Sequence, residues 1–153
     1  MDTLGGMVTT EPLRMAPGHV VRRLHQAYAA AWTRYVDPVL TGPQYAVLMA
    51  ANAYPDIDQG SIAGRVALDR STMADVCRRL EDRGLIRRET APGDGRRKLL
   101  YLTETGSEVL ATVGERVRRL HEEMLSGDDT AAFLERLNGL VKRWDSLADG
   151  PPD

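Results

Sequence analysis

Three consecutive cationic residues, Arg96, Arg97 and Lys98, follow a segment in which Pro, Gly, Asp and Gly occupy positions 92–95. Proline presets φ and glycine tolerates positive φ, so this segment is expected to reverse the chain. The flanking residues, from 85 to 106, read as two short strands around that turn. A hairpin that carries three cations beside its turn suits contact with the phosphate backbone or the minor groove of DNA.

The residues that precede the hairpin, from 69 to 84, have the spacing of a helix with two distinct faces. One face is apolar at i, i+3, i+4 and i+7 and is expected to meet a core: Met73, Val76, Cys77 and Leu80. The opposite face carries hydroxyls, carboxylates and arginines: Ser71, Thr72, Asp75, Arg78, Arg79 and Asp82. Asp69 or Ser71 can cap the amino end, and Gly84 can end the helix in the left-handed conformation.

A shorter helix is expected just before this one, over residues 59–67, with a brief turn at Leu68 and Asp69. Two helices joined by about three or four residues, the second with hydroxyls and arginines on its polar face, are typical of a helix-turn-helix. A basic hairpin follows directly. The sequence therefore predicts a winged helix.

The order of these segments resembles the MarR family of bacterial transcriptional regulators, over about residues 18–147. The most specific part is Asp94-Gly-Arg96, followed at the family's spacing by Leu102-Thr103 and Gly106. Residues 40–48 and 68–87 also look like family segments. Many members have Arg directly after the wing Asp, whereas this chain has Gly95. The resemblance implies a sequence-specific regulator of double-stranded DNA, with a palindromic operator and a repressor function.

The expected fold is mainly α with a small β-hairpin wing: a winged helix-turn-helix core with long N- and C-terminal dimerisation helices. We expect a flexible tail over residues 1–16, a helical dimerisation region over 17–39 and 103–149, and a DNA-binding domain over 40–102. The terminal helices are too apolar to be left exposed, so a homodimer is predicted, with recognition helices one DNA turn apart. The alternative is that these helices complete a monomeric core.

Charge is distributed unevenly along the 153 residues. Residues 61–100 carry ten Lys and Arg against six Asp and Glu, whereas residues 101–153 carry six against eleven, and the whole chain has a net charge of −2. A positive band confined to the DNA-reading segment is the electrostatic pattern expected of a nucleic-acid-binding domain. The acidic remainder argues against an indiscriminate polycation.

Several other classes of protein are disfavoured. One cysteine excludes an intrachain disulfide framework, and no apolar run reaches the ~20 residues of a membrane span, so a cytoplasmic protein without a membrane partner is expected. Three histidines, His19, His25 and His121, lack metal-ligand spacing. No phosphate loop, nucleophile elbow or carboxylate pair is found, so we expect no cofactor, no metal and no enzyme.

The predicted DNA contacts come from the second helix and the hairpin: Arg70, Ser71, Thr72, Asp75, Arg78, Arg79, Arg87, Arg88, Asp94, Arg96, Arg97 and Lys98. Other roles are open for many of them. The two helix arginines can instead pair with neighbouring carboxylates, and the two hydroxyls can simply cap the helix. The wing Asp either shapes the turn or, as in the family, orients an arginine, which here would be Arg96. Arg87 and Arg88 suit a solvated strand face or a phosphate clamp equally.

Ligand sensing is implied by the resemblance alone. Family members commonly bind small aromatic or phenolic acids between the dimerisation helices and the winged helix. The candidate liners of that cleft are Arg23, His25, Tyr28, Trp32 and Tyr45. Two alternatives remain, a winged-helix module that binds protein without sensing a ligand and a redox sensor that uses Cys77. The apolar neighbours of Cys77 favour a buried hydrophobe over a sensor.

Overall fold

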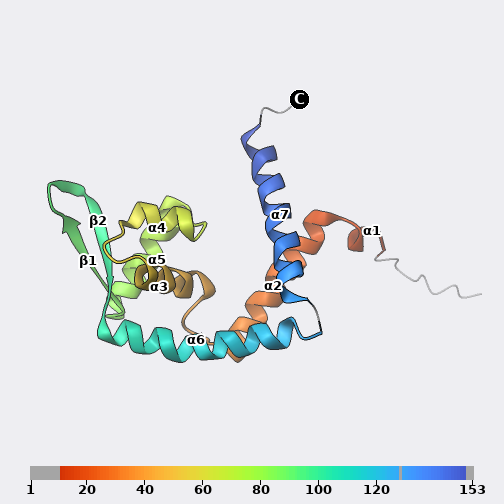
Figure 1. Ribbon diagram of the computed structural model, residues 1–153, viewed down its shortest axis with the longest axis horizontal. Helices are drawn as coiled ribbons and strands as arrows, with labels where there is room; N and C mark the ends of the chain where they lie inside the picture. The colour runs from red at the N-terminus through yellow and green to blue at the C-terminus, as the bar shows by residue number, and fades with distance from the viewer. Residues whose placement is uncertain (1–10, 128, 151–153) are drawn as a thin grey trace, which may run out of the picture. The chain divides into compact units, whose positions relative to one another are not determined.

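The computed structural model describes residues 11–127 and 129–150 (Figure 1). In chain order its elements are α1 (Glu11–Arg14), α2 (Pro17–Tyr35), α3 (Gly42–Ala53), α4 (Gln59–Arg65), α5 (Arg70–Asp82), β1 (Ile86–Ala91), β2 (Asp94–Leu102), α6 (Glu104–Met124) and α7 (Thr130–Asp149). They form two compact units that divide within α6, after Val117. The predicted class, mainly helical with one antiparallel hairpin, is confirmed.

The helices begin at side chains that the sequence marks as caps. Thr41 forms a capping box with Gln44, since each side chain accepts a hydrogen bond from the other residue's backbone N–H. Asp58, Asp69 and Asp129 cap α4, α5 and α7 in the same sense, each with a carboxylate that accepts from a backbone N–H three residues on. The choice left open between Asp69 and Ser71 therefore falls to Asp69.

Two boundaries differ from the sequence-based expectation. Residues 11–14, which were expected to belong to a flexible tail, form the short helix α1, while residues 1–10 lie outside the described part of the chain. Helix α2 ends at Tyr35, before Pro38, because the Asp37 carboxylate accepts hydrogen bonds from the backbone N–H groups of Val39 and Leu40 and turns the chain there.

The core of the first unit brings together side chains from α3, α4, α5 and the hairpin. Its fully buried members include Leu40, Leu48, Ile62, Met73, Leu80, Ile86 and Leu100. The predicted apolar face of α5 is confirmed, because Met73, Val76, Cys77 and Leu80 are all buried. The polar face of α5 is thereby turned outward, beside the hairpin.

The hairpin has an irregular tip. Pairing runs in register from Ile86↔Leu102 to Thr90↔Lys98, and then Ala91 pairs with Asp94, so residues 95–97 bulge from β2. Only Pro92 and Gly93 lie between the strands, with Gly93 at φ +79°. The predicted four-residue turn over 92–95 was therefore two residues too long, because Asp94 and Gly95 belong to β2.

The preceding loop adds a short third pairing to the hairpin. The backbone N–H of Leu100 donates to the Ile57 carbonyl at 3.1 Å, and Asp58 forms a bridge with Leu99. This pairing holds β2 against the start of α4. The wing is consequently attached to the helix-turn-helix at its side as well as at its base, as the neighbouring ribbons of α4 and β2 in Figure 1 indicate.

A tight junction joins the end of α5, the start of β1 and the start of α6. Thr103 Oγ1 donates to the Gly84 carbonyl at 2.6 Å and accepts from the Gly106 N–H at 2.9 Å. The Thr103 N–H donates to the Leu85 carbonyl at 3.1 Å. Gly84 has φ +68°, as the predicted left-handed helix end requires, and a Cβ on Gly106 would lie 2.0 Å from the Leu85 carbonyl oxygen.

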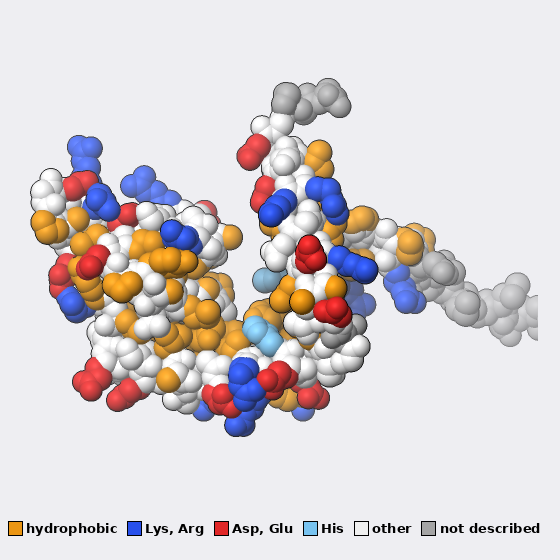
Figure 2. All heavy atoms as spheres, viewed as in Figure 1, with side chains coloured by type: hydrophobic (Ala, Val, Ile, Leu, Met, Phe, Trp, Pro, Cys, Tyr) orange, Lys and Arg blue, Asp and Glu red, His pale blue; other side chains and the backbone are white. Residues whose placement is uncertain are grey.

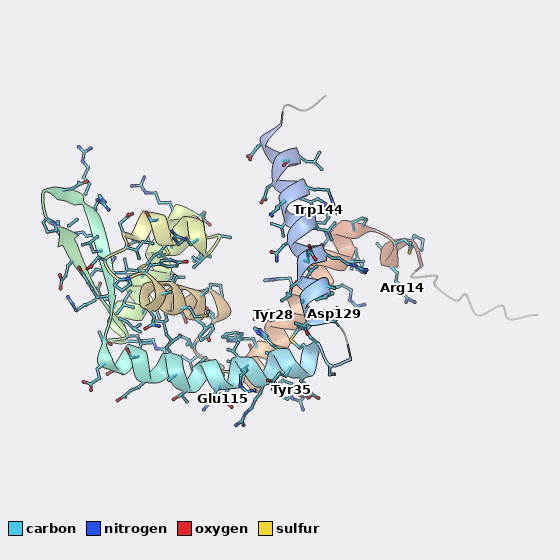
Figure 3. All side chains as sticks on the ribbon, in the orientation of Figure 1. Arg14, Tyr28, Tyr35, Glu115, Asp129 and Trp144 are labelled. Atoms are coloured by element: carbon cyan, nitrogen blue, oxygen red, sulfur yellow. The ribbon has the colours of Figure 1, made fainter. Side chains whose placement is uncertain are left out.

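The second unit consists of the end of α6 and α7. Helix α7 has no buried residue, and Leu134, Leu140, Val141, Trp144 and Leu147 are all exposed. Trp144 projects from the C-terminal half of this helix (Figure 3). None of the helices in the described part of the chain combines the length and the apolar character needed to cross a membrane.

Candidate nucleic-acid interface

A groove of about 540 Å³ lies in the first unit between α4, the start of α5 and the wing. Its lining is rich in cations and small residues: Asp58, Gln59, Gly60, Ala63, Gly64, Leu68, Arg70, Met73, Arg96, Arg97 and Lys98. Figure 2 shows cationic side chains at the hairpin tip and over the neighbouring helices. The structure thus brings the predicted contacts Arg70, Arg96, Arg97 and Lys98 to one surface.

The amino end of α5 is organised by Asp69. Its carboxylate accepts from the Thr72 N–H at 2.9 Å and from the hydroxyls of Ser71 and Thr72, each at 2.6 Å. These hydrogen bonds, those from the two hydroxyls foremost, hold the pKa of Asp69 well below its usual range. Ser71 and Thr72 are exposed, so their oxygens remain accessible from outside.

Further along α5, Asp75 holds both predicted arginines. Arg79 Nε donates to Asp75 Oδ2 at 2.7 Å, and Arg78 pairs with the same carboxylate and, at 3.4 Å, with Asp82. Hydrogen bonding by Arg78 and the charge of Arg79 lower the pKa of Asp75. In the unbound protein, Arg78 and Arg79 therefore form ion pairs with neighbouring carboxylates, which was one of the two roles left open by the sequence. Both side chains nevertheless stay more than half exposed.

The three wing cations differ in their partners. Arg97 donates to Asp58 at 3.2 Å, and Lys98 Nζ donates to Thr90 Oγ1 at 2.7 Å. The Arg96 guanidinium makes no hydrogen bond or ion pair with any described residue, and only its backbone N–H is bound, by the Asp94 carboxylate at 3.1 Å. Asp94 therefore shapes the bulge through the backbone of Arg96 and leaves the guanidinium directed outward.

Arg87 and Arg88, at the base of the wing, have intramolecular partners. Arg88 is half-buried and donates its backbone N–H and its Nε to Glu81, at 3.2 and 2.9 Å, which ties β1 to α5. This contact lowers the pKa of Glu81 and raises that of Arg88. Arg87 lies over the Tyr101 ring, 4.2 Å from its centre, and pairs with Glu89. Both arginines brace the wing.

Sequence reasoning missed Asp58. This carboxylate caps α4, accepts from Ser61 and pairs with Arg97, 39 residues away. Hydrogen bonds from Ser61 and the charge of Arg97 lower the pKa of Asp58. The position of Asp58 before a helix start was a signal for the cap, but its contact with the wing depends on the fold and has no local signature.

We predict that Asp58→Asn strengthens nonspecific DNA binding, because it releases Arg97. Asparagine is as good an N-cap as aspartate, so α4 stays intact while one cation loses its partner. The log–log salt slope of binding to a random duplex should steepen by about one. Fluorescence anisotropy across a salt series measures this, with Asp129→Asn at the cap of α7 as the matched control. An unchanged slope would show that Arg97 already contacts DNA in the native protein.

Cys77 behaves as the predicted buried hydrophobe. Its side chain is fully buried, and that burial raises the pKa of the thiol to about 11. A sensing thiol needs exposure and a lowered pKa, and Cys77 has neither.

We expect the native protein to react with an aromatic disulfide reagent only as fast as it unfolds. The same thiol should react stoichiometrically within seconds in denaturant, and peroxide should leave DNA binding unchanged. Rapid labelling of the folded protein, or oxidation that releases DNA, would restore the redox interpretation.

Three of the five predicted ligand-site residues form an aromatic cluster between α2 and α3. The Trp32 ring centre lies 6.1 Å from that of Tyr28 and 5.5 Å from that of Tyr45. Burial raises the pKa of both tyrosines, and the neighbouring Tyr45 adds to the effect on Tyr28. Tyr28 projects from α2 in Figure 3.

Trp32 has a structural role within this cluster. It is buried, and its Nε1 donates to the Leu40 carbonyl at 2.7 Å. Arg23 and His25 are exposed on α2 and are not part of the cluster. Sequence reasoning did not single out Gly114, where a Cβ would approach the Tyr45 hydroxyl to 3.3 Å. Within residues 11–127 and 129–150, no three His, Cys, Asp or Glu side chains gather to hold a metal ion.

Comparisons with known proteins identify the family of the chain. Residues 40–98, which contain α3, α4, α5 and the tip of the wing, match the family model for the MarR family. The transcriptional regulator HosA of Escherichia coli O111:H- is 36% identical over 132 residues, which are 84% of this chain and 97% of HosA.

Solved structures extend the match to the whole fold. The PcaV transcriptional regulator from Streptomyces coelicolor, in complex with its natural ligand, has a TM-score of 0.82 and 40% identity, over 90% of this chain and 96% of PcaV. BpsR of Bordetella bronchiseptica, whose DNA binding is regulated by 6-hydroxynicotinic acid, has a TM-score of 0.71 and 25% identity, over 82% of this chain and 96% of BpsR. The chain belongs to the MarR family and is a DNA-binding transcriptional regulator.

Proposed function

We propose that the protein is a homodimeric repressor that binds a palindromic operator and releases it when a small aromatic acid binds. The observation that carries the DNA half of this proposal is the cationic groove between α5 and the wing, with Arg96 unpaired among the described residues. Helix α5, the recognition helix, supplies contacts to base edges, and the wing supplies a cation for the minor groove.

The predicted DNA contacts divide into two groups in this proposal. The first group touches DNA: Arg70, Ser71, Thr72, Arg78, Arg79, Arg96 and Lys98. The second group positions the first or, in the case of Arg97, stays paired within the protein with Asp58: Asp75, Arg87, Arg88, Asp94 and Arg97. The division follows the partners of each side chain, since Arg88 and Arg87 are engaged within the wing and the two aspartates would repel phosphate.

The homodimer is supported by apolar side chains that each unit leaves exposed. In the first unit, Val20, Val21 and Leu24 of α2 are 45–50% exposed, and in the second, α7 exposes Trp144 and Leu147. Large apolar side chains exposed at neighbouring positions of a helix are what a subunit interface would cover. We assign residues 17–39 and 103–149 to dimerisation and residues 40–102 to DNA binding. Sedimentation at micromolar concentration tests this, and a monomer would remove the two-half-site mechanism.

The aromatic cluster supports the ligand half of the proposal. Tyr28 and Tyr45 are half-buried next to Trp32, and a cluster of tilted rings that carries two phenolic hydroxyls suits an aromatic or phenolic acid. Arg23 would supply a cation for the carboxylate, or His25 a hydrogen-bond donor. The regulation of BpsR by 6-hydroxynicotinic acid supports the same class of effector, and the complex of PcaV with its natural ligand supports a small-molecule effector.

One titration tests both halves. Duplex from the protein's own promoter region should bind with a steep negative log–log salt slope. Salicylate or 6-hydroxynicotinic acid should weaken that binding, and DNA should weaken acid binding by the same factor, because coupling is reciprocal. Salt-insensitive binding to a protein instead would favour an interaction module. The proposed function involves no catalytic step. It places the protein in the cytoplasm, where the chromosome is.

A further inference from the structure

In the unbound protein, the hydroxyl groups of Ser71 and Thr72 at the start of α5 both donate their protons to Asp69. Ser71 Oγ lies 2.6 Å from Asp69 Oδ1, and Thr72 Oγ1 lies 2.6 Å from Asp69 Oδ2. An ionised carboxylate has lone pairs and no proton, so the hydroxyl is the donor in both contacts. Hydrogen bonds to a charged acceptor are roughly twice as strong as those between neutral groups, so both protons are firmly held.

A hydroxyl whose single proton is engaged can only accept further hydrogen bonds. The phosphates and deoxyribose rings of duplex DNA offer acceptors and no donors, so Ser71 and Thr72 have no partner on the DNA backbone. The negative charge of Asp69 behind them also disfavours a phosphate there. Donors do occur in the major groove, at the N6 amino group of adenine and the N4 amino group of cytosine.

We propose that Ser71 and Thr72 are specificity-determining residues that accept hydrogen bonds from exocyclic amino groups of adenine or cytosine in the major groove. Asp69 is a positioning residue, which touches no base and fixes the direction of both hydroxyls. The inference rests on the DNA-binding function proposed above and deepens it. It gains support from the adjoining groove, which the neighbouring residue Arg70 lines together with the wing cations.

The same helix offers the opposite chemistry about two turns later. Arg78 and Arg79 are donors only, and Asp75 holds them in place. Arginine suits the O6 and N7 acceptors of guanine. Helix α5 therefore presents hydrogen-bond acceptors at its amino end and donors further along. We accordingly expect each half-site to contain both an adenine or cytosine for the hydroxyls and a guanine for the arginines.

The test begins with the best duplex that the wild-type protein selects from a randomised library. Each adenine of a half-site is replaced by purine, which has hydrogen in place of the amino group, and each cytosine by pyrimidin-2-one. In anisotropy titrations, wild type should lose about three- to tenfold in affinity at one or two positions. Thr72→Val or Ser71→Ala should abolish that loss at its own position, because the accepting oxygen is already gone. The base position at which the analogue and the side-chain substitution show this non-additive effect identifies the contacted base as adenine or cytosine.

Asp69→Asn separates hydroxyl direction from helix capping. Asparagine caps a helix as well as aspartate, so the melting temperature should stay within about 2 °C of wild type. Its amide nitrogen, however, donates, which frees a hydroxyl to donate in turn. The variant should lose the preference for the amino-bearing base and gain about three- to tenfold for guanine or thymine there. Ser61→Ala is the matched control, because Ser61 Oγ donates to the capping Asp58 of α4 at 2.8 Å.

Two results overturn the inference. Coupling of Thr72 or Ser71 to a guanine or thymine acceptor would show that the hydroxyls donate to DNA. The absence of coupling at every position would show that they read no base. If wild type instead selects no sequence above the random pool, the proposed sequence-specific function fails, and the inference fails with it.

Discussion

Gly106→Ala is expected to destabilise the protein by at least about 3 kcal/mol. The added Cβ would lie 2.0 Å from the Leu85 carbonyl oxygen and 2.9 Å from its carbon. Leu85 cannot withdraw, because its N–H donates to the Leu80 carbonyl and its own carbonyl accepts from Thr103. Relief of the overlap therefore requires breaking the junction that joins α5, β1 and α6.

Thermal unfolding at one protein concentration measures this effect. A loss of that size should lower the melting temperature by about 6–12 °C. The control is Gly64→Ala, since Gly64 lies in α4 with no atom within 4 Å of its Cβ position. That change should be neutral or stabilise the helix by up to about 1 kcal/mol. Equal melting temperatures for the two variants would mean that the close approach at Gly106 is absent in solution.

Arg96→Ala is expected to weaken operator binding by about 1–3 kcal/mol, which is roughly 5- to 150-fold. The Arg96 guanidinium is exposed at the bulge and forms no ion pair with any described residue, so it is available to the minor groove without breaking an existing contact. Removal also takes away one phosphate-neutralising charge and should flatten the log–log salt slope.

The neighbouring residue provides a control of equal charge. Arg97→Ala should weaken binding much less, by under about 0.5 kcal/mol, because Arg97 is already neutralised by Asp58 and the median exposed pair contributes little. Circular dichroism of both variants establishes that the fold is kept. Equal losses for the two variants would show that the wing acts only through its total charge.

Much of the fold follows from local signals in the sequence. Thr41 with Gln44, Asp69 and Gly84 mark helix ends through contacts that span three residues or fewer, and the structure has all of them. The apolar positions of α5 are predictable for the same reason, since a helix repeats them every three or four residues. Such features depend little on what the rest of the chain does.

The features that escaped prediction depend on distant partners. Asp58 meets Arg97 across 39 residues, and Gly106 meets Leu85 across the whole hairpin. The misplaced turn also depends on pairing between strands, because Ala91 pairs with Asp94 and residues 95–97 bulge from β2. The same holds for Arg88 in the site, because its partner Glu81 lies on α5 and the contact that braces the wing has no local signature.

The Thr103 junction has a mechanical consequence. Its three hydrogen bonds join the recognition helix, the base of the wing and the first turn of α6 into a single rigid body. Helix α6 has 21 residues and is about 30 Å long, so a tilt of about 5° at one end displaces the other by about 3 Å. The DNA-reading parts are fixed to the amino end of this helix. A small rotation of α6 is therefore enough to move α5 and the wing together out of register with the DNA grooves, without deforming either one.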